Sequence, residues 1–242
     1  LSNHTIKSLL NFGRGVFGAD FGSVSFVINK FKNDGNQKVI CRSLFRGKSY
    51  VDSVNQKEEW FFDKSFNSYT VLQSKFDLVP NKGLAYWIPD RAFDCFDNYS
   101  SLSDSYDAKQ GMATSDNKRF RRDWSEISFH KTSIINQNNP KWFPYNSGGE
   151  FRKWFGNQYY VVNWEKNGHE IKNFEKSVVR NELFYTQESI SWSKVTIGGL
   201  AFRYFPEGFL FDVAGCSVFN NNKDNLLYLQ GVLNSKLKEP FV

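Results

Sequence analysis

The chain has 242 residues, a net charge of +6 and 18% aromatic residues, which suits phosphate contact and base stacking as well as an ordinary basic globular protein. Its length can bury a sizeable core, and the wide spacing of Cys41, Cys95 and Cys216 indicates neither a disulfide framework nor a zinc site. We therefore expect a reducing, cytoplasmic setting, and no apolar stretch approaches the roughly 18 residues of a membrane span. Since the chain starts at Leu1 without a Met, we expect it to lie inside a longer protein.

The N-terminal segment predicts a β-hairpin followed by a short helix. Residues 23–29 and 38–45 alternate apolar and polar side chains, and the turn-forming pair Asp34 and Gly35 lies between them. Residues 55–62 carry charges followed by three aromatic residues, which predicts a helix with one apolar end.

A strand, a helix and a linker are expected next. Residues 84–88 predict a strand that a proline stops, and Asp90 is placed to cap a short helix after it. Residues 98–107 are rich in Ser, Asp and Tyr without apolar periodicity, which is typical of a linker. We therefore expect a domain boundary near Ser100.

The second half predicts two further hairpins and a C-terminal helix. Residues 152–155 and 159–164 flank a Gly-Asn pair, and residues 200–205 and 209–213 flank Pro-Glu-Gly. Aliphatic residues at three- and four-residue spacings over 226–237 predict an amphipathic helix. Together these elements predict an α+β fold of short antiparallel strands and hairpins with a few helices, ending in that helix.

Two motifs imitate a cofactor site and a catalytic site. Gly13, Gly15 and Gly18 match G-x-G-x-x-G, but the dinucleotide motif needs a buried strand before it and a helix after it. Here a strand is expected to follow, so we predict a Gly-rich bend. Asn139-Pro-Lys-Trp142 lacks the second proline of the Asn-Pro-Pro-aromatic tetrapeptide that holds a flipped adenine, so we expect no methyl transfer there. No catalytic, cofactor-binding or metal residue is therefore assigned in this chain.

Two basic and aromatic segments of the second half favour nucleic-acid binding instead. Residues 114–124 hold four cations within five positions beside aromatic rings, and residues 141–156 mix cations, aromatic residues and glycines. Cations neutralise phosphates and glycines let the backbone approach closely, while Asn146, Arg152 or Trp154 could reach base edges or stack. The alternative is a solvated basic rim around an aromatic core.

The same segments carry a family resemblance. The chain closely resembles BREX-type adenine-specific DNA methyltransferases in residues 110–120, 141–156, 160–165, 190–193, 202–209 and 15–24. A weaker run, 233–236, is shared with type I restriction specificity subunits. The family pattern favours Gly where this chain has Ser115, a residue that tolerates positive φ less well.

The resemblance implies that the chain is the C-terminal, target-recognition portion of such an enzyme. The implied pieces are terminal strands of the methyltransferase domain (1–45), a connecting subdomain (46–100), the target-recognition domain (101–225) and a C-terminal helix (226–242). It also implies that the parent enzyme uses S-adenosylmethionine and that this portion holds no cofactor and is inactive alone. The implied partner is double-stranded DNA, with other defence-system subunits as a further expectation and no membrane.

Residues from both segments are candidates for DNA contact, with the cations on phosphates and a subset reading the groove. The candidates are Thr114, Asp116, Asn117, Lys118, Arg119, Arg121, Arg122, Lys141, Trp142, Asn146, Arg152, Lys153 and Asn163. Two alternatives stay open. The apolar stripe of the C-terminal helix could dock another defence-system subunit or complete a restriction enzyme's specificity unit, although packing on its own sheet is the favoured interpretation of that stripe. The Trp, Tyr and Asn content would also suit a carbohydrate-binding module.

Overall fold

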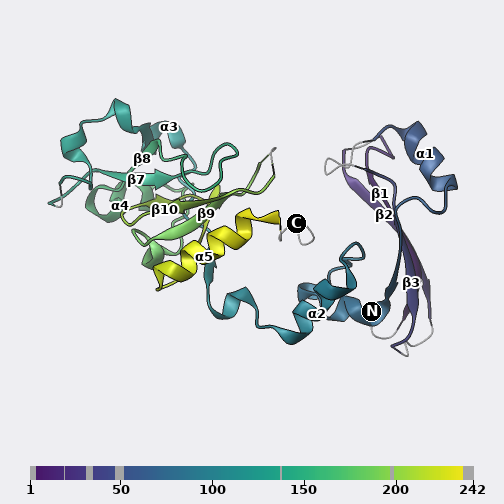
Figure 1. Ribbon diagram of the computed structural model, residues 1–242. Helices are drawn as coiled ribbons and strands as arrows, with labels where there is room; N and C mark the ends of the chain where they lie inside the picture. The colour runs from purple at the N-terminus through teal and green to yellow at the C-terminus, as the bar shows by residue number, and fades with distance from the viewer. Residues whose placement is uncertain are drawn as a thin grey trace. The chain divides into compact units, whose positions relative to one another are not determined.

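The computed structural model describes residues 4–18, 20–30, 35–46, 52–136, 138–196 and 199–236. It divides into two compact units, with the division between Ser100 and Ser101 (Figure 1). Unit 1 contains one hydrophobic core cluster and unit 2 contains two. No helix within the described ranges combines the length and the apolar character that crossing a membrane requires.

Unit 1 is built on one four-stranded sheet with the order β2-β1-β3-β4. The parallel pair is β1 with β3, and the other neighbours are antiparallel. Its strands and α-helices are β1 (Thr5–Arg14), β2 (Gly22–Asn29), β3 (Lys38–Ser43), α1 (Val54–Phe62), β4 (Ser68–Leu72) and α2 (Asp90–Asn98). Two 3-10 helices, Gln73–Asp77 and Pro80–Lys82, follow β4. Because β3 and β4 pair, the expected pieces 1–45 and 46–100 share this sheet.

The predicted hairpin between residues 23–29 and 38–45 is wrong. Both segments are strands, but β1 lies between them and pairs with each. The glycine-rich stretch after Arg14 returns the chain at once, so that Gly22 lies opposite Arg14 and β2 forms its hairpin with β1. Residues 8–12 alone are too short an apolar run to predict a strand, whereas β1 extends over Thr5–Arg14. Asp34 lies outside the described residues.

Both helices predicted in unit 1 are present as α1 and α2, but the strand predicted at residues 84–88 is wrong. That segment forms tight turns in which the Ile88 N–H donates to the Ala85 carbonyl at 3.3 Å. The reason is that Ala85 and its neighbour Tyr86 are both buried in the core, whereas a strand would send them to opposite faces.

The predicted cap of α2 is also wrong, although the helix begins where expected. Pro89 occupies the N-cap and Asp90 is the first helical residue, where its carboxylate pairs with Lys75 at 2.5 Å. A proline is tolerated there because the first N–H groups of a helix have no intrahelical acceptor.

Unit 2 contains two four-stranded sheets, β10-β9-β12-β5 and β11-β7-β8-β6. The first is antiparallel throughout, and in the second only β11 and β7 run parallel among the described strands. The strands are β5 (Asp107–Lys109), β6 (Arg121–Asp123), β7 (Trp142–Asn146), β8 (Tyr160–Asn163), β9 (Ser189–Ser193), β10 (Phe202–Phe205), β11 (Leu210–Phe211) and β12 (Gly215–Phe219). The α-helices are α3 (Asn117–Phe120), α4 (Glu165–Lys172) and α5 (Lys223–Asn234).

Neither hairpin predicted in unit 2 forms. Strands β10 and β11 bracket the Pro-Glu-Gly turn but belong to different sheets, because β10 pairs with β9 while β11 pairs with β7. Residues 152–155 contain no strand, only an isolated bridge between Trp154 and Arg203. Strand β8 pairs instead with β6 and β7. Strand pairing is decided by long-range packing, which a local turn signal does not report.

The predicted C-terminal helix is present as α5, which lies across the β9–β10 side of its sheet (Figure 1). Leu226 and Leu229 are buried in a cluster with Ile190 and Phe202. The apolar stripe therefore packs on its own unit, which confirms the prediction that it packs against its own sheet. Leu237 lies outside the described residues. The observed mixture of small, mostly antiparallel sheets with a few helices confirms the α+β class.

Candidate nucleic-acid interface

The segment before α3 forms a tight turn that positions the first candidate residues. The Thr114 hydroxyl donates to Oδ1 of Asn117 at 2.7 Å, and the Asp116 carboxylate caps α3 by accepting the Arg119 N–H at 3.0 Å. Ser115 occupies the left-handed region at φ 55°, and its hydroxyl donates to the Lys176 carbonyl at 2.7 Å. The turn thus forms with Ser at the position where the family pattern favours Gly.

A groove of about 340 Å³ opens beside α3 and β6. Its lining combines three cations, two carboxylates, an amide and an aromatic ring. These residues are Asn117, Lys118, Arg121, Arg122, Asp123, Glu126 and Tyr160. We call this feature the α3 groove.

Arg121 connects the α3 groove to the second basic segment of the sequence. Its Nη1 donates to the Ser147 hydroxyl at 2.9 Å, and its guanidinium lies 3.9 Å from the centre of the Tyr160 ring. The register of β6 and β8 explains the stacking, because Arg121 lies opposite Val162 and Tyr160 is two residues away on the same face. A guanidinium fixed in this way keeps further N–H groups for a ligand.

Arg122 is fixed by the backbone at the C-terminal end of α3. Its Nη1 donates to the carbonyls of Lys118 at 2.6 Å and Arg121 at 2.7 Å, where a cation also balances the helix dipole. The same guanidinium lies 5.9 Å from the Trp142 ring on β7. Arg121 and Arg122 therefore each bring residues 114–124 against residues 141–156.

Lys118 and Arg119 differ in how their charge is balanced. Lys118 is exposed and has no ion pair with any residue that the structure describes. Arg119 donates twice to Oε1 of Glu170, at 2.8 and 3.0 Å, and its guanidinium lies near the rings of Phe120 and Phe174. The charge of Arg119 is thus compensated within the protein, whereas that of Lys118 faces solvent.

The remaining cations among the candidates lie outside the α3 groove. The Lys141 ammonium lies 3.8 Å from the Glu165 carboxylate and 5.7 Å from the centre of the Trp142 ring. The Lys153 ammonium donates to the Asn234 carbonyl at 2.9 Å, at the C-terminal end of α5, and the exposed Arg152 lies over the Tyr159 ring.

Three candidate residues are buried, which corrects the expectation that they reach DNA. Asn146 is 1% exposed, and its amide donates to the Ser191 hydroxyl at 2.6 Å and the Gly215 carbonyl at 3.2 Å. The Asn163 amide donates to the Glu170 carboxylate at 2.8 Å, and the Thr114 hydroxyl donates to Oδ1 of Asn117. Buried polar groups need such partners, so these side chains hold the unit together instead of reading bases.

Tyr145 of β7 and Asp212 form a buried pair of a phenol and a carboxylate. The Tyr145 hydroxyl donates to Oδ2 of Asp212 at 2.5 Å, and Asp212 also accepts the Ala214 N–H at 2.8 Å. Burial first, and then the negative charge of Asp212, raise the pKa of Tyr145 well above its ordinary value. Tyr145 therefore remains a neutral hydrogen-bond donor.

Asp123 and Glu126 are not among the predicted candidates, and neither is the aromatic groove residue Tyr160. Its place beneath Arg121 follows from the β6–β8 register, which joins residues about forty positions apart. The alternation of Tyr160 with buried Val161 was the available signal, but it does not name the partner strand.

The two decoy motifs occupy ordinary structural positions. The Gly13–Gly18 motif ends β1 and leads into β2, which confirms the bend before a strand and places no helix N-terminus there. Asn139 is in a left-handed bend at φ 58°, shortly before β7. The prediction that this tetrapeptide transfers no methyl group stays a prediction.

Comparison with known proteins places the chain in a family. No protein-family profile matches the chain. It is 36% identical over 210 residues to the adenine-specific methyltransferase PglX of Lacticaseibacillus casei (strain Zhang), covering 79% of this chain and 17% of PglX. It is 32% identical over 243 residues to the adenine-specific methyltransferase BrxX of Escherichia coli O9:H4 (strain HS), covering 98% of this chain and 19% of BrxX.

A solved structure, the type IIG restriction endonuclease BpuSI, aligns with 96% of this chain and 33% of its own at 10% identity and a TM-score of 0.30. That score is too low to indicate a common fold. The chain spans less than a fifth of the length of the two methyltransferases that it matches. Over most of its own length, the chain is a homologue of part of the BREX-type adenine-specific methyltransferases.

Proposed function

We propose that this chain is the DNA-binding target-recognition module of an adenine-specific DNA methyltransferase in a phage-defence system. In this proposal the parent enzyme transfers a methyl group from S-adenosylmethionine to N6 of a flipped adenine, and the present chain positions the duplex and reads its sequence. The support is the homology to PglX and BrxX, both named adenine-specific methyltransferases, together with the α3 groove.

The observation that carries the proposal is that two basic and aromatic segments meet beside the α3 groove. Arg121 reaches Ser147 at 2.9 Å and Arg122 lies over Trp142, so side chains from residues 114–124 and 141–156 share one surface region. Cations held beside aromatic rings suit a nucleic acid because its backbone is anionic and its bases present flat faces.

In this proposal the groove residues have different roles. Lys118, Arg121 and Arg122 neutralise phosphates, which fixes the register of the duplex without reading its sequence. Asn117 is the exposed amide of the lining, and its Oδ1 is oriented by Thr114, so we assign it to base-edge contact. Asp123 and Glu126 disfavour phosphates at their end of the groove, which orients the backbone path.

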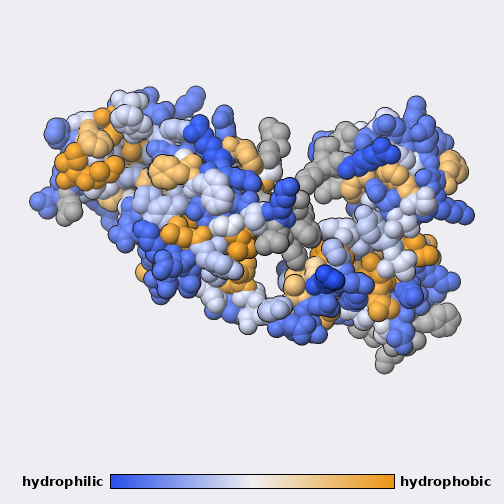
Figure 2. Space-filling view, in the orientation of Figure 1, coloured by the Kyte–Doolittle hydropathy of each residue, from blue (hydrophilic) through white to orange (hydrophobic). Residues whose placement is uncertain are grey.

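The edge of the unit 1 sheet supports the proposal that residues 1–45 belong to a larger methyltransferase domain. Strand β2 is an edge strand whose Val24, Phe26 and Val27 are all more than half exposed, and Figure 2 shows apolar patches on this unit. An apolar edge strand exposed on both faces invites association, and soluble proteins cover such edges.

The test is a salt titration of duplex binding by the whole chain and by Arg121→Ala/Arg122→Ala. Binding to random-sequence DNA is compared, at one ionic strength, with binding to DNA that carries the target site of a related methyltransferase. Loss of two phosphate contacts should weaken binding about equally on both DNAs and reduce the salt slope by about two. The matched control is Arg121→Lys/Arg122→Lys, which keeps both charges while losing the fork geometry.

Two results would contradict the proposal. The first is an unchanged salt slope in the double alanine variant when its unfolding midpoint in urea equals that of the chain without substitutions, which we call the parent chain. The second is the absence of any salt-dependent duplex binding by the parent chain. Glycan binding without DNA affinity would instead support the carbohydrate alternative.

A further inference from the structure

The loop that follows β7, residues 147–157, has a backbone that is held in place along most of its length. We call it the aromatic loop. The Ser193 hydroxyl donates to the Gly149 carbonyl at 2.7 Å, and the Asn157 amide donates to the Glu150 carbonyl at 2.9 Å. Nη1 of Arg203 donates to the Arg152 carbonyl at 3.3 Å. A loop fixed at so many carbonyls presents its side chains in one arrangement.

Arg203 supports the aromatic loop from inside. It is 1% exposed, and its Nη2 donates to the Ser193 hydroxyl at 2.9 Å, which itself holds Gly149. Both bonds of this guanidinium go to neutral oxygens, and its Nε has no partner among the described atoms. Burial lowers the pKa of Arg203. A buried cation whose acceptors are the Arg152 carbonyl of the loop and the Ser193 hydroxyl of β9 stabilises the loop conformation at a cost in desolvation.

The tip of the loop is a strained turn centred on Trp154. The Phe155 N–H donates to the Lys153 carbonyl at 2.9 Å, two residues back, and Trp154 between them has φ 74°. This φ and this bond match the γ-turn form that is rare and strained, and a bulky residue with positive φ is an outlier. Bonds from the neighbouring strand impose it, because Trp154 N–H donates to Phe202 and its carbonyl accepts from Tyr204, each at 2.9 Å.

Burial compensates for this strain only in part. Trp154 is 54% exposed and Phe155 is 62% exposed, so each residue gains less than half of the transfer free energy that full burial would supply. Glycine would adopt the same φ without strain and without exposing a large ring. Strained residues that the surrounding structure holds in place cluster at functional sites. The turn thus spends stability on presenting two rings to solvent.

We propose that this turn is an aromatic wedge that stacks its Trp154 and Phe155 rings on unstacked bases of duplex DNA. The inference rests on the proposed function and adds a second contact to it, because the α3 groove holds phosphates and the wedge holds bases. Every base has a flat face, so stacking needs no particular sequence. An enzyme that modifies a base must extrude it, and the opened stack then offers a gap that an exposed ring can fill.

Charge and continuity favour DNA over a protein partner. Arg152 and Lys153 precede the turn directly, and Glu150 is the one carboxylate within residues 147–157. Ser147 begins the loop and accepts a hydrogen bond from Arg121, so the aromatic loop starts beside a residue that lines the α3 groove. Cations placed beside exposed rings match a phosphate backbone and its bases.

The test uses the whole chain and a short duplex that carries 2-aminopurine in place of one adenine. Trp154→Gly removes the ring and the strain together, so we expect its unfolding midpoint in urea to be no lower than that of the parent chain. We expect its duplex affinity to fall about 10-fold, the value of one lost stacking contact. The rise in 2-aminopurine fluorescence on binding, which reports unstacking, should be lost as well.

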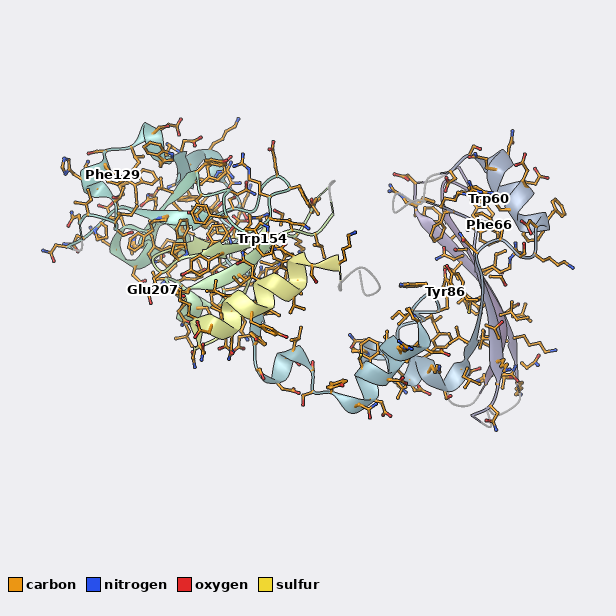
Figure 3. The ribbon with its side chains drawn as sticks, in the orientation of Figure 1. Trp60, Phe66, Tyr86, Phe129, Trp154 and Glu207 are labelled. Atoms are coloured by element: carbon orange, nitrogen blue, oxygen red, sulfur yellow. The ribbon has the colours of Figure 1, made fainter. Side chains whose placement is uncertain are left out.

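Two variants serve as controls. Trp154→Phe keeps a ring at the same position and should retain most of the affinity and of the fluorescence rise. Phe129→Ala removes an exposed ring that Figure 3 places well apart from Trp154, and it should change neither quantity.

The outcomes separate this inference from the proposed function. A parent chain without duplex binding overturns the proposed function, and the wedge with it. A parent chain that binds duplex while Trp154→Gly binds equally well, with the same fluorescence rise, overturns the wedge alone and leaves a protein partner as the use of these rings. A clearly lower unfolding midpoint for Trp154→Gly would overturn it too, because the ring would then be structural.

Discussion

Around Asn146, polar side chains are packed away from water, whereas beside α3 they line an open groove. The Asn146 amide donates to Ser191 and Gly215, and its Oδ1 accepts the Gly148 N–H at 3.2 Å, all in the interior. In the α3 groove, Arg121 and Arg122 use Nη1 for hydrogen bonds to described residues and still border solvent. The two regions belong to the same short sheet, in which β8 lies between β7 and β6.

The comparison teaches that burial, rather than residue type, separates an amide that holds the interior together from one that is exposed to solvent. In the interior every polar atom has given up water, so losing one partner leaves another group unsatisfied. In the groove a lost partner is replaced by solvent. Substitutions around Asn146 should therefore change stability, and substitutions in the groove should change binding.

The largest expected effect is that of Asn146→Ala. The change removes the acceptor of the buried Gly148 N–H and the amide donor to the Ser191 hydroxyl, and the free energy of unfolding should fall by about 3 kcal/mol. Urea unfolding measures it. The matched control is Asn221→Ala, at an exposed loop position, which should stay within about 0.5 kcal/mol of the parent chain. Equal stabilities for the two variants would contradict the structural role of Asn146.

A second prediction concerns Tyr145→Phe, which tests how the stability that the buried Tyr145–Asp212 hydrogen bond provides depends on pH. At neutral pH the variant should lose about 1–2 kcal/mol, because Asp212 loses a buried donor. The folded-state pKa of Tyr145 is raised, so its contribution to stability is complete below about pH 10, the unfolded pKa, and is lost as the pH rises toward the folded pKa.

Tyr145→Phe should consequently show a shallower loss of urea midpoint above about pH 10 than the parent chain. Tyr228→Phe, at an exposed position of α5, is the control and should follow the parent chain. A parent chain whose midpoint does not fall in that range would show that Tyr145 is not held neutral by its surroundings.

Lys118→Ala should change binding and leave stability unchanged. Lys118 has no ion pair with a described residue, so its removal should shift the free energy of unfolding by less than about 0.5 kcal/mol. The slope of duplex affinity against salt should decrease by about one. Lys118→Arg should keep the slope. A loss of stability as large as that of Asn146→Ala would remove the distinction between the groove and the interior.

The smallest effect is expected for Ser115→Gly in the turn before α3. Glycine removes the left-handed strain of about 1 kcal/mol, but it increases the entropy of the unfolded chain and gives up the bond from Ser115 to Lys176. The two contributions nearly cancel, so the unfolding free energy should change by less than about 1 kcal/mol. Ser115→Val should be clearly more destabilising, because a β-branched residue fits this φ poorly.

The helices were predictable because their signals are local. The charged and aromatic run of α1, the start of α2 after a proline and the spacing of Leu226 and Leu229 in α5 each act within a few residues. The hairpins were not, because the sequence does not name the partner of a strand. Neither Pro-Glu-Gly nor Asp-Gly decided a pairing, and β1 took the place between β2 and β3.

In the candidate site, too, some residues could be placed from local sequence and others only from tertiary contacts. Lys118, Arg121 and Arg122 come from one short run, so the sequence could place them together. Asn146 and Asn163 were selected for the chemistry of their amides, but their burial depends on β9, β12 and α4. Tyr160 was missed because only the β6–β8 register brings it under Arg121.

By itself, the sequence determined the α+β composition, the three longer helices and the two basic and aromatic segments, because these depend on the order of neighbouring residues. Tertiary structure decided which strands pair, which amides leave water, and that Trp154 is held in a strained turn with its ring exposed. The physical reason is that burial and hydrogen-bond satisfaction are properties of a packed site, to which residues far apart in the chain contribute.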